Sequence, residues 1–136
     1  MDEAERERRG RLRAPFVMYC DIERDVGKEG VAHGAVTLRE ELTNSAGAAH
    51  GGLLMTMLDT IMAGAARSIM AEDHGMMTID LQAAFLSPGR GRLTGEGRVV
   101  RGGGSLIFCE GDIRDAQGTL VAKGTGVFRP RRPPRK

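Results

Sequence analysis

Asp59 is the residue whose type and surroundings most strongly indicate chemistry in this 136-residue chain. It lies in an apolar run beside Leu58, Ile61 and Met62. A carboxylate among such side chains is costly unless it is paired or used, and Arg67 is two helical turns further on, roughly 12 Å away at the helical rise. Partial desolvation strengthens a carboxylate as a base, so Asp59 could activate water or attack a carbonyl carbon itself. The structural alternative is a buried acid that accepts backbone N–H groups.

The tripeptide His50-Gly51-Gly52 precedes the same run. Backbone N–H groups at the start of a helix have no partner within the helix, and the helix dipole favours negative charge there. A glycine also lets a carbonyl group approach the backbone closely. The two glycines could therefore stabilise the oxyanion of an acyl transfer, an effect of about 3–4 kcal/mol per donor, or they could simply begin the helix.

Asn44 is a polar residue that could assist Asp59. The amide of Asn44 both donates and accepts, so it could hold an attacking water or the Asp59 carboxylate. Asn44 also stands in a run of turn formers, residues 43–47, where a structural role is the alternative. By itself, Thr78 is an ordinary strand residue.

Other kinds of active site do not fit the sequence. A His-Gly-Gly tripeptide also occurs in lipase oxyanion loops, but a serine hydrolase needs a G-x-S-x-G turn, and the sequence has none. His33, His50 and His74 lack the spacing of metal ligands, and Cys20 and Cys109 form no C-x-x-C pair. We therefore expect no metal and no cofactor, and a cytoplasmic protein with two free thiols.

Composition and charge exclude two classes of partner. Four Phe, one Tyr and no Trp, with a net charge of +2, give neither the aromatic platform nor the positive charge that nucleic acids select. The most apolar stretch, residues 53–70, contains Asp59 and Arg67 and is too polar to span a bilayer comfortably. We expect neither nucleic-acid nor membrane binding.

The element that carries Asp59 is predicted to be a helix from about Leu53 to Ala71. It is apolar on most sides, so it must be covered on most sides and belongs in the core. One face is small or polar, because such residues recur at three- and four-residue steps: Gly52, Thr56, Asp59, Thr60, Ala63 and Arg67.

The residues after this helix change to the period of two that is typical of strands. Short links rich in glycine separate the strands, and such links join antiparallel neighbours. The fold class is therefore α+β, with one early strand, one buried helix and then a meander. The predicted strands are Val36–Arg39, Met77–Leu86, Leu93–Arg101, Leu106–Arg114 and Leu120–Phe128.

Both ends of the chain are charged. Residues 1–14 predict a charged arm or short helix, because opposite charges recur four residues apart. Residues 130–136 predict a basic disordered tail rich in proline and arginine. A single domain, residues 15–129, lies between them.

The string from Asn44 to Gly52, followed by Asp59, by Thr78-Ile79-Asp80 and by Phe85-Leu86-Ser87-Pro88, resembles the hotdog-fold acyl-CoA thioesterases. The most similar group is the PaaI type of phenylacetic acid degradation. The resemblance implies a hotdog fold, in which one long central helix is wrapped by a curved antiparallel β-sheet of five to six strands. It also implies a homodimer or a tetramer built from two dimers, with each active site at a subunit boundary.

The resemblance also assigns roles to residues. Asp59 of one subunit would face the partner's copies of Asn44, His50 and Gly51, with the Gly51 N–H as oxyanion donor, His50 as an orienting group and Thr78 beside the attacking water. Contacts to the substrate are expected from Gly52, Met62, Ala63, Arg101, Gly104 and Ser105.

The predicted function is hydrolysis of an aryl- or medium-chain acyl-CoA thioester to the free acid and CoA. Asp59 would act as general base or as nucleophile, and the sequence leaves both routes open. The alternative, from a different class, is a hotdog module that binds acyl-CoA or another acyl ligand without turnover.

Overall fold

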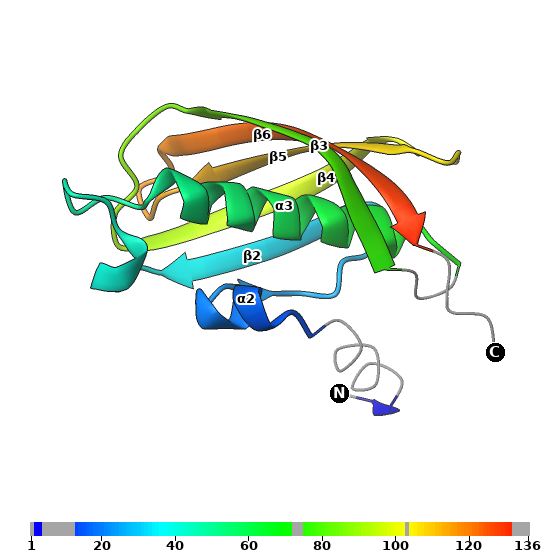
Figure 1. The fold of residues 1–136 in the computed structure, drawn as a ribbon, viewed down its shortest axis with the longest axis horizontal. Coiled ribbons are helices and arrows are strands. Elements are labelled where there is room, and N and C mark those ends of the chain that lie inside the picture. Colours follow the sequence, from blue (N-terminus) through cyan, green and yellow to red (C-terminus); the bar gives the residue numbers. More distant parts are fainter. Residues whose placement is uncertain (1, 4–12, 72–74, 103, 132–136) are drawn as a thin grey trace.

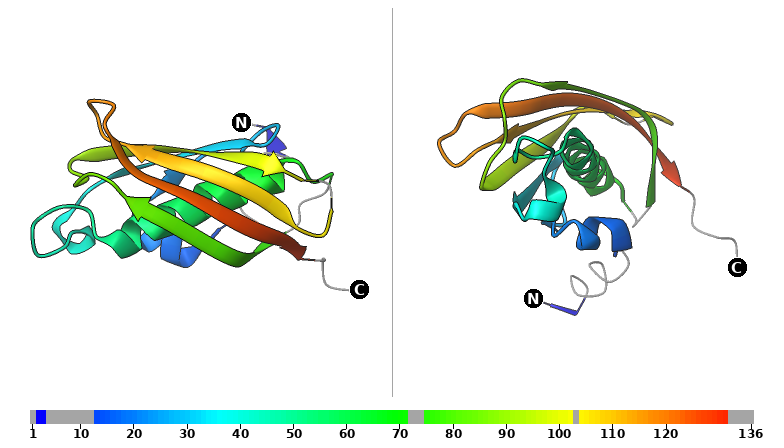
Figure 2. Two further views of the ribbon diagram at one scale, coloured as in Figure 1. Left: turned by 90° about the horizontal axis from the view of Figure 1, so that it is seen from above. Right: turned by 60° about the vertical axis from the view of Figure 1, so that its left-hand side comes forward.

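The computed structural model describes residues 2–3, 13–71, 75–102 and 104–131. One long helix, α3 (Gly51–Ser68), lies along the concave face of an antiparallel six-stranded sheet (Figure 1). The sheet order is β1-β2-β4-β5-β6-β3, so β1 and β3 form its two edges. The strands are β1 (Glu23–Arg24), β2 (Val31–Thr37), β3 (Gly75–Phe85), β4 (Arg92–Arg101), β5 (Ile107–Arg114) and β6 (Leu120–Arg131). The end-on view in Figure 2 shows the sheet curling over α3, with β2 and β3 on opposite sides of the helix. The predicted α+β architecture, with one helix wrapped by a curved sheet, is confirmed.

Helix α3 is buried as its apolar sequence predicts. Met57, Leu58, Ile61 and Met62 are at most 1% exposed and pack against the inner face of the sheet. Among the described residues, no helix is both long and apolar enough to cross a membrane.

Glycines on the inner face of the sheet let the helix backbone come unusually close. A Cβ atom at Gly97 would lie 2.5 Å from the carbonyl oxygen of Ile61, so no other residue fits there without moving the helix. This close contact fixes the distance between α3 and the sheet, and thereby the position of the polar face of the helix.

Strand β3 is an exposed edge with one irregularity. Thr78 pairs with Phe128, Asp80 pairs with Val127, and Ile79 is the extra residue of a β-bulge between them. Because a bulge inserts one residue, Thr78 points inward together with Leu81, whereas strict alternation would turn them to opposite faces.

The chain on either side of β2 contains short elements that the sequence patterns did not predict. These are α2 (Pro15–Tyr19), β1 and the 3-10 helix η1 (Glu40–Leu42). Helix α2 starts at a proline, which suits the first turn of a helix, and Val17 packs against the core beside α3. Elements of two to five residues are too short to leave a periodic signal.

Several boundaries differ from those predicted. The early strand covers Val31–Thr37 and not Val36–Arg39, and α3 begins at Gly51 and ends at Ser68. Strand β6 continues through Arg131, so the first two residues of the predicted tail belong to the sheet. The rest of that tail, residues 132–136, and most of the predicted N-terminal arm, residues 1 and 4–12, lie outside the described residues.

Both cysteines behave as the sequence indicates. Cys20 and Cys109 are buried free thiols. Burial raises the pKa of Cys109 to about 12, so this thiol stays protonated and packs as a small apolar group.

Candidate active site

The loop before α3 is a tight turn that brings Asn44 close to the start of the helix. Thr43 and Ala49 form an isolated antiparallel bridge, and Gly47 adopts a left-handed φ of 78° at the tip. The Asn44 side-chain oxygen accepts the backbone N–H groups of Ala46 and Ala48, at 2.9 and 3.2 Å. The amide oxygen of Asn44 thus stabilises the loop, and its amide NH2 group donates to no atom of the described residues.

His50 caps α3 with its ring. Its Nδ1 atom accepts the backbone N–H of Gly52 at 2.8 Å. In a neutral imidazole the acceptor nitrogen carries no proton, so the proton of His50 is on Nε2, and the ring is exposed. A Cβ atom at Gly52 would lie 3.0 Å from Nδ1, so glycine at this position lets the ring sit over the helix start.

Because of this cap, the backbone N–H groups of the two glycines differ in their hydrogen bonding. Gly52 uses its N–H for the bond to His50, whereas the N–H of Gly51 has no hydrogen-bond partner among the described residues. Gly51 is the first residue of α3 and is only half-buried. The positive end of the helix dipole and one unpaired N–H therefore meet at a single accessible atom, which suits an oxyanion.

Asp59 lies eight residues after Gly51 on α3 and is half-buried. The hydroxyl group of Thr78, on the inward side of β3, donates to one Asp59 carboxylate oxygen at 2.7 Å. This bond fixes the carboxylate and leaves its second oxygen for another donor, such as a water molecule. Thr78, which the resemblance placed beside the attacking water, thus lies at the Asp59 carboxylate within the single chain.

Asp59 and Gly51 are far apart within one chain. Eight residues of α3 separate them, which is about 12 Å at the helical rise. A reacting carbonyl must lie within about 3.5 Å of both the attacking group and the oxyanion donor. One subunit thus contains two halves of a site, Asn44-His50-Gly51 and Asp59-Thr78, and does not bring them together.

An apolar pocket of about 360 Å³ opens beside Gly51. It lies between the loop before α3, the start of the helix and the end of β3. The described residues that line it are uncharged: Asn44, Ala48, Ala49, Gly51, Leu54, Phe85, Leu86, Ser87, Pro88 and Gly89. The role of Phe85 as a wall of this pocket was not predicted, although the residue belonged to the family-like string.

The other predicted substrate contacts are spread over the molecule. Gly52 is exposed and Ala63 is half-buried one turn after Asp59, so both lie on the open face of α3. Met62 is different, because its side chain is completely buried against Gly111 and Gly126 of the sheet. Because no surface of Met62 is exposed, the single chain does not support the predicted contact between Met62 and the substrate. Thr60, which was placed on the polar face, is likewise buried and donates to the Thr56 carbonyl oxygen.

Arg101, Gly104 and Ser105 lie in and next to the exposed link between β4 and β5. A Cβ atom at Gly102 in this link would meet Ile69, just beyond the last turn of α3. The link is therefore at the opposite end of α3 from Gly51, about 27 Å away along the 18-residue helix. Within one chain these residues cannot contact a thioester held at Gly51.

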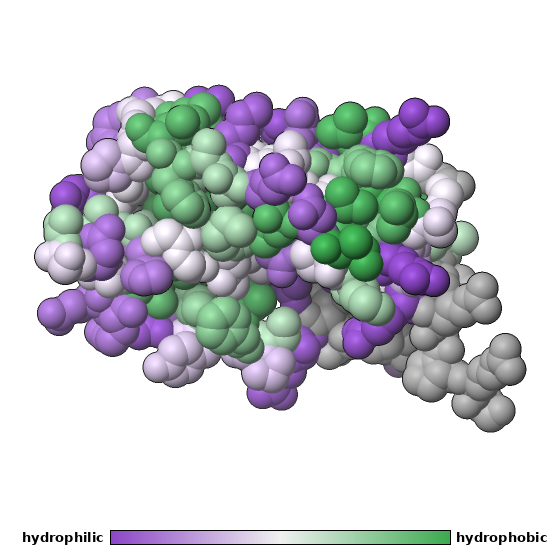
Figure 3. All heavy atoms as spheres, turned by 45° about the horizontal axis from the view of Figure 1, so that its top comes forward, coloured by the Kyte–Doolittle hydropathy of each residue, from purple (hydrophilic) through white to green (hydrophobic). Residues whose placement is uncertain are grey.

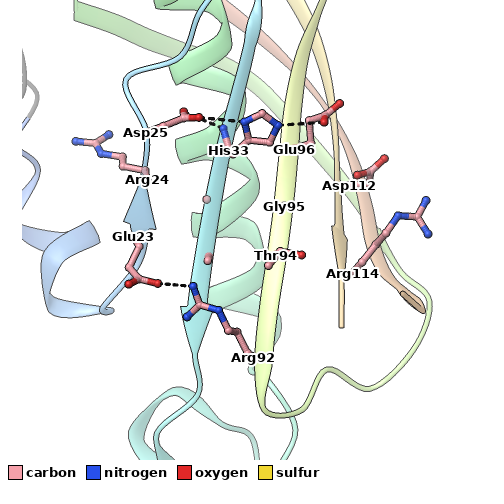
Figure 4. A pocket seen from close by; sticks show the side chains of 12 residues that line it. Glu23, Arg24, Asp25, His33, Arg92, Thr94, Gly95, Glu96, Asp112 and Arg114 are labelled. Carbon is pink, nitrogen blue, oxygen red and sulfur yellow. Dashed lines mark hydrogen bonds and ion pairs between the residues drawn. The ribbon is translucent and has the colours of Figure 1, made fainter. Parts of the chain in front are cut away.

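A larger hollow, of about 700 Å³, lies elsewhere, on the convex face of the sheet (Figure 4). Its walls carry acidic and basic side chains in nearly equal number, and most of them pair with one another. His33 bridges Asp25 and Glu96 at 3.0 and 3.1 Å, and Arg92 pairs with Glu23 at 2.9 Å. This hollow is wide and open, and neither Asp59 nor Gly51 lines it.

Comparison with known families decides the family of the chain. The family model of the thioesterase superfamily matches residues 46–122, which include Asp59, Gly51 and every residue that lines the pocket beside it except Asn44. The chain belongs to the thioesterase superfamily. This thioesterase is a thioester hydrolase with the hotdog fold, as the sequence predicted.

Relatives of this thioesterase support the assignment. A provisionally named esterase of Saccharolobus solfataricus is 35% identical over 102 residues, which are 74% of this chain and 72% of that protein. Another provisionally named esterase, from Halobacterium salinarum, is 36% identical over 119 residues, with 76% of this chain and 79% of that protein covered. The structure of the Escherichia coli PaaI protein, from the phenylacetic acid degradation operon, shares the fold with a TM-score of 0.81 at 21% identity and covers 94% of each chain.

Proposed function

We propose that this thioesterase hydrolyses acyl-CoA as a homodimer, with Asp59 of one subunit and Gly51 of the other at the same thioester. The observation that carries the proposal is the unpaired Gly51 N–H at the start of α3. It is a preorganised donor that the helix does not use, and the carboxylate of Asp59 on the same helix is about 12 Å away. Two copies related by a twofold axis would complete two sites at once, because each copy supplies the half that the other lacks.

The exposed edge strand supports such a dimer. Strand β3 is 11 residues long, it pairs on one side only, and its apolar side chains include Met77 and Ile79, which are 47% and 50% exposed. Long unprotected edges are ready to pair with another strand. The space-filling view in Figure 3 shows apolar residues gathered in patches between polar ones on the part of the molecule that includes this edge. A second copy of β3 would cover the edge and bring α3 of the two subunits near one another.

The chemistry follows from the two halves. In the general-base route, the free oxygen of Asp59 takes a proton from water while the water oxygen bonds to the thioester carbonyl carbon. The carbonyl oxygen becomes an oxyanion and accepts the Gly51 N–H. When the oxyanion re-forms the carbonyl, the carbon–sulfur bond breaks, and the CoA thiolate takes the proton back from Asp59.

A second route begins with attack by the Asp59 carboxylate itself. This gives a mixed anhydride and CoA thiolate, and water then hydrolyses the anhydride. Both routes need the same carboxylate and the same oxyanion donor. Incorporation of ¹⁸O into the Asp59 side chain during single-turnover hydrolysis in ¹⁸O-water would identify the anhydride route, because the general-base route leaves both carboxylate oxygens unlabelled.

For the CoA moiety, the candidates are exposed cations. Arg90 is the one nearest the Gly51 half, because its guanidinium donates to the Ala46 carbonyl oxygen of the same loop, at 3.3 Å. Arg101, Lys123 and Arg129 are exposed on β4 and β6. A flexible nucleotide held by scattered surface cations needs no dedicated phosphate loop.

The test is thiol release from a panel of acyl-CoA thioesters, with wild type compared with Asp59→Asn and Asp59→Ala. We expect both variants to lose about 10²–10⁴-fold in kcat, the range for removal of a general base, while size-exclusion chromatography shows the same oligomer. Equal rates in wild type and variants would overturn the assignment of Asp59. Binding of acyl-CoA by a wild type that releases no thiol from any of the thioesters would favour the non-catalytic alternative.

A further inference from the structure

Phe85 closes one side of the apolar pocket beside Gly51. It is the last residue of β3 and pairs with the buried Ala122, so its side chain points to the inner face of the sheet. A Cβ atom at Gly51 would lie 3.6 Å from two carbon atoms of the Phe85 ring. The ring therefore lies beside the first turn of α3, where a side chain at position 51 would touch it, and both residues line the pocket.

The rest of the pocket is small and apolar. Ala48, Ala49 and Leu54 form a floor that is at most 5% exposed. Phe85 and Leu86 form the opposite rim and are 52% and 55% exposed. The small side chains of Ala48 and Ala49 leave room for a ligand. The larger side chains of Phe85 and Leu86 can limit the size of that ligand.

The lining indicates which part of a thioester would enter. The pocket presents no charged side chain among its described residues, and its polar groups, Asn44 and Ser87, belong to a lining that is otherwise apolar or glycine. The pantetheine arm of CoA carries amides and the nucleotide carries phosphates, and both would be left unpaired against Leu54 and Phe85. An acyl chain has no hydrogen-bonding group to leave unpaired, and the burial of its apolar surface stabilises the complex.

We infer that Phe85 is the residue that limits the size of the acyl group. This inference rests on the proposed function and deepens it, because it assigns the pocket beside Gly51 to the acyl group and not to the leaving thiol. When the thioester oxygen accepts the Gly51 N–H, the acyl chain extends into the pocket and ends against the phenyl ring. Replacing the ring by a methyl group lengthens the pocket toward solvent and admits larger acyl groups.

The test uses two substrate series with Phe85→Ala. The first series varies the acyl group on CoA, from short to long straight chains and to aryl-acetyl groups. The second keeps one short acyl group and varies the thiol, as CoA, pantetheine or N-acetylcysteamine. Phe85→Leu retains an apolar wall, and Phe108→Ala removes another partly exposed phenyl ring, 43% exposed against 52% for Phe85, from the outward side of β5.

We expect Phe85→Ala to raise the ratio of kcat/KM for long over short acyl groups by about 10-fold or more, the usual effect of room for added methylene groups in an apolar pocket. Phe85→Leu should give a smaller shift and Phe108→Ala none, and the preference among the three thiols should stay as in wild type. An unchanged acyl profile, or an altered thiol preference, in a variant that still turns over short acyl-CoA overturns the inference. Wild type that is inactive on both series overturns the proposed function itself, so the two failures are distinguishable.

Discussion

The Nδ1 atom of His50 lies 2.8 Å from the backbone nitrogen of Gly52 and accepts its hydrogen. This bond gives the two adjacent glycines different duties. Gly52 completes the helix cap, and Gly51 keeps an N–H that is free of partners within the described chain.

Deleting the Gly51 N–H should abolish most of the activity without unfolding the helix. Gly51 is the first residue of α3, where proline is well tolerated because this N–H is not used by the helix. His50 has φ −63° and ψ 138°, a conformation that a residue before proline adopts readily. We expect Gly51→Pro to lower kcat by about 10²–10³-fold, measured by thiol release.

Gly51→Ala is the matched control for this substitution. It retains the N–H, and its Cβ atom would make only an ordinary contact with Phe85 at 3.6 Å. Its kcat should therefore be much closer to that of wild type, and both variants should melt near the wild-type temperature. Equal losses in the two variants would show that bulk at this position, and not the donor, is what matters.

Removing the Thr78 hydroxyl should release the Asp59 carboxylate from its fixed orientation. The 2.7 Å bond is to a charged group, and a bond of that kind is worth about 1.5 kcal/mol or roughly 10-fold in rate. We expect Thr78→Val to lose about this factor in kcat with little change in KM, while Thr78→Ser retains activity. A Thr78→Ser variant as slow as Thr78→Val would contradict the role of the hydroxyl.

The hydrogen bonds of His33 to Asp25 and Glu96 should make the stability of the fold depend on pH. Hydrogen bonds to Asp25 first, and then to Glu96, outweigh the opposing effect of burial and raise the pKa of His33 above its ordinary value of 6.5. Arg98 pairs with Glu96 from the next outward position of β4. Because the protonated ring is favoured in the folded state, the stabilisation is full below about pH 6.5 and is lost as the pH rises through the raised pKa.

Melting temperatures of wild type and His33→Gln from pH 5 to pH 9 measure this contribution. The advantage of wild type should be greatest at the acidic end and should shrink as the pH increases. It should also be small and weaken with added salt, because the His33 side chain is 57% exposed. A wild-type advantage that grows with pH would show that the sign is wrong.

The close approach of α3 to the sheet should make Gly97 intolerant of any side chain. Its Cβ atom would lie 2.5 Å from the Ile61 carbonyl oxygen, so either the helix or β4 must move. We expect Gly97→Ala to lower the free energy of unfolding by about 3 kcal/mol, measured by urea denaturation. Gly104→Ala is the control, because nothing lies within 4 Å of a Cβ there, and its stability should not change.

The sequence predicted those features that depend on local pattern. The apolar run around Asp59 predicted a buried helix with one polar face, and alternation predicted four of the strands close to their observed bounds. These signals suffice because burial imposes periods of 3.6 and 2 on helices and strands. The composition of the loop before α3 likewise predicted a turn.

The features that were missed depend on contacts that no period reports. The bulge at Ile79 turns Thr78 toward Asp59, and a one-residue insertion leaves no mark on the alternation of β3. Met62 seemed suited to a pocket, but the rotation of α3 directs it into the sheet. The resemblance pointed to the Gly51 N–H as oxyanion donor, but the residue pattern alone could not separate Gly51 from Gly52, because the distinction depends on which N–H the His50 ring reaches.

A mixture of two inactive variants tests the shared site most directly. In a heterodimer of Asp59→Asn and Gly51→Pro, one site contains both substitutions and the other contains neither. If the site is shared, random re-association should restore about a quarter of the wild-type activity, because half of the dimers are mixed and each has one intact site. If each subunit carries its own complete site, both sites of every heterodimer are impaired, and a mixture shown by mass spectrometry to contain heterodimers that remains inactive would contradict the account.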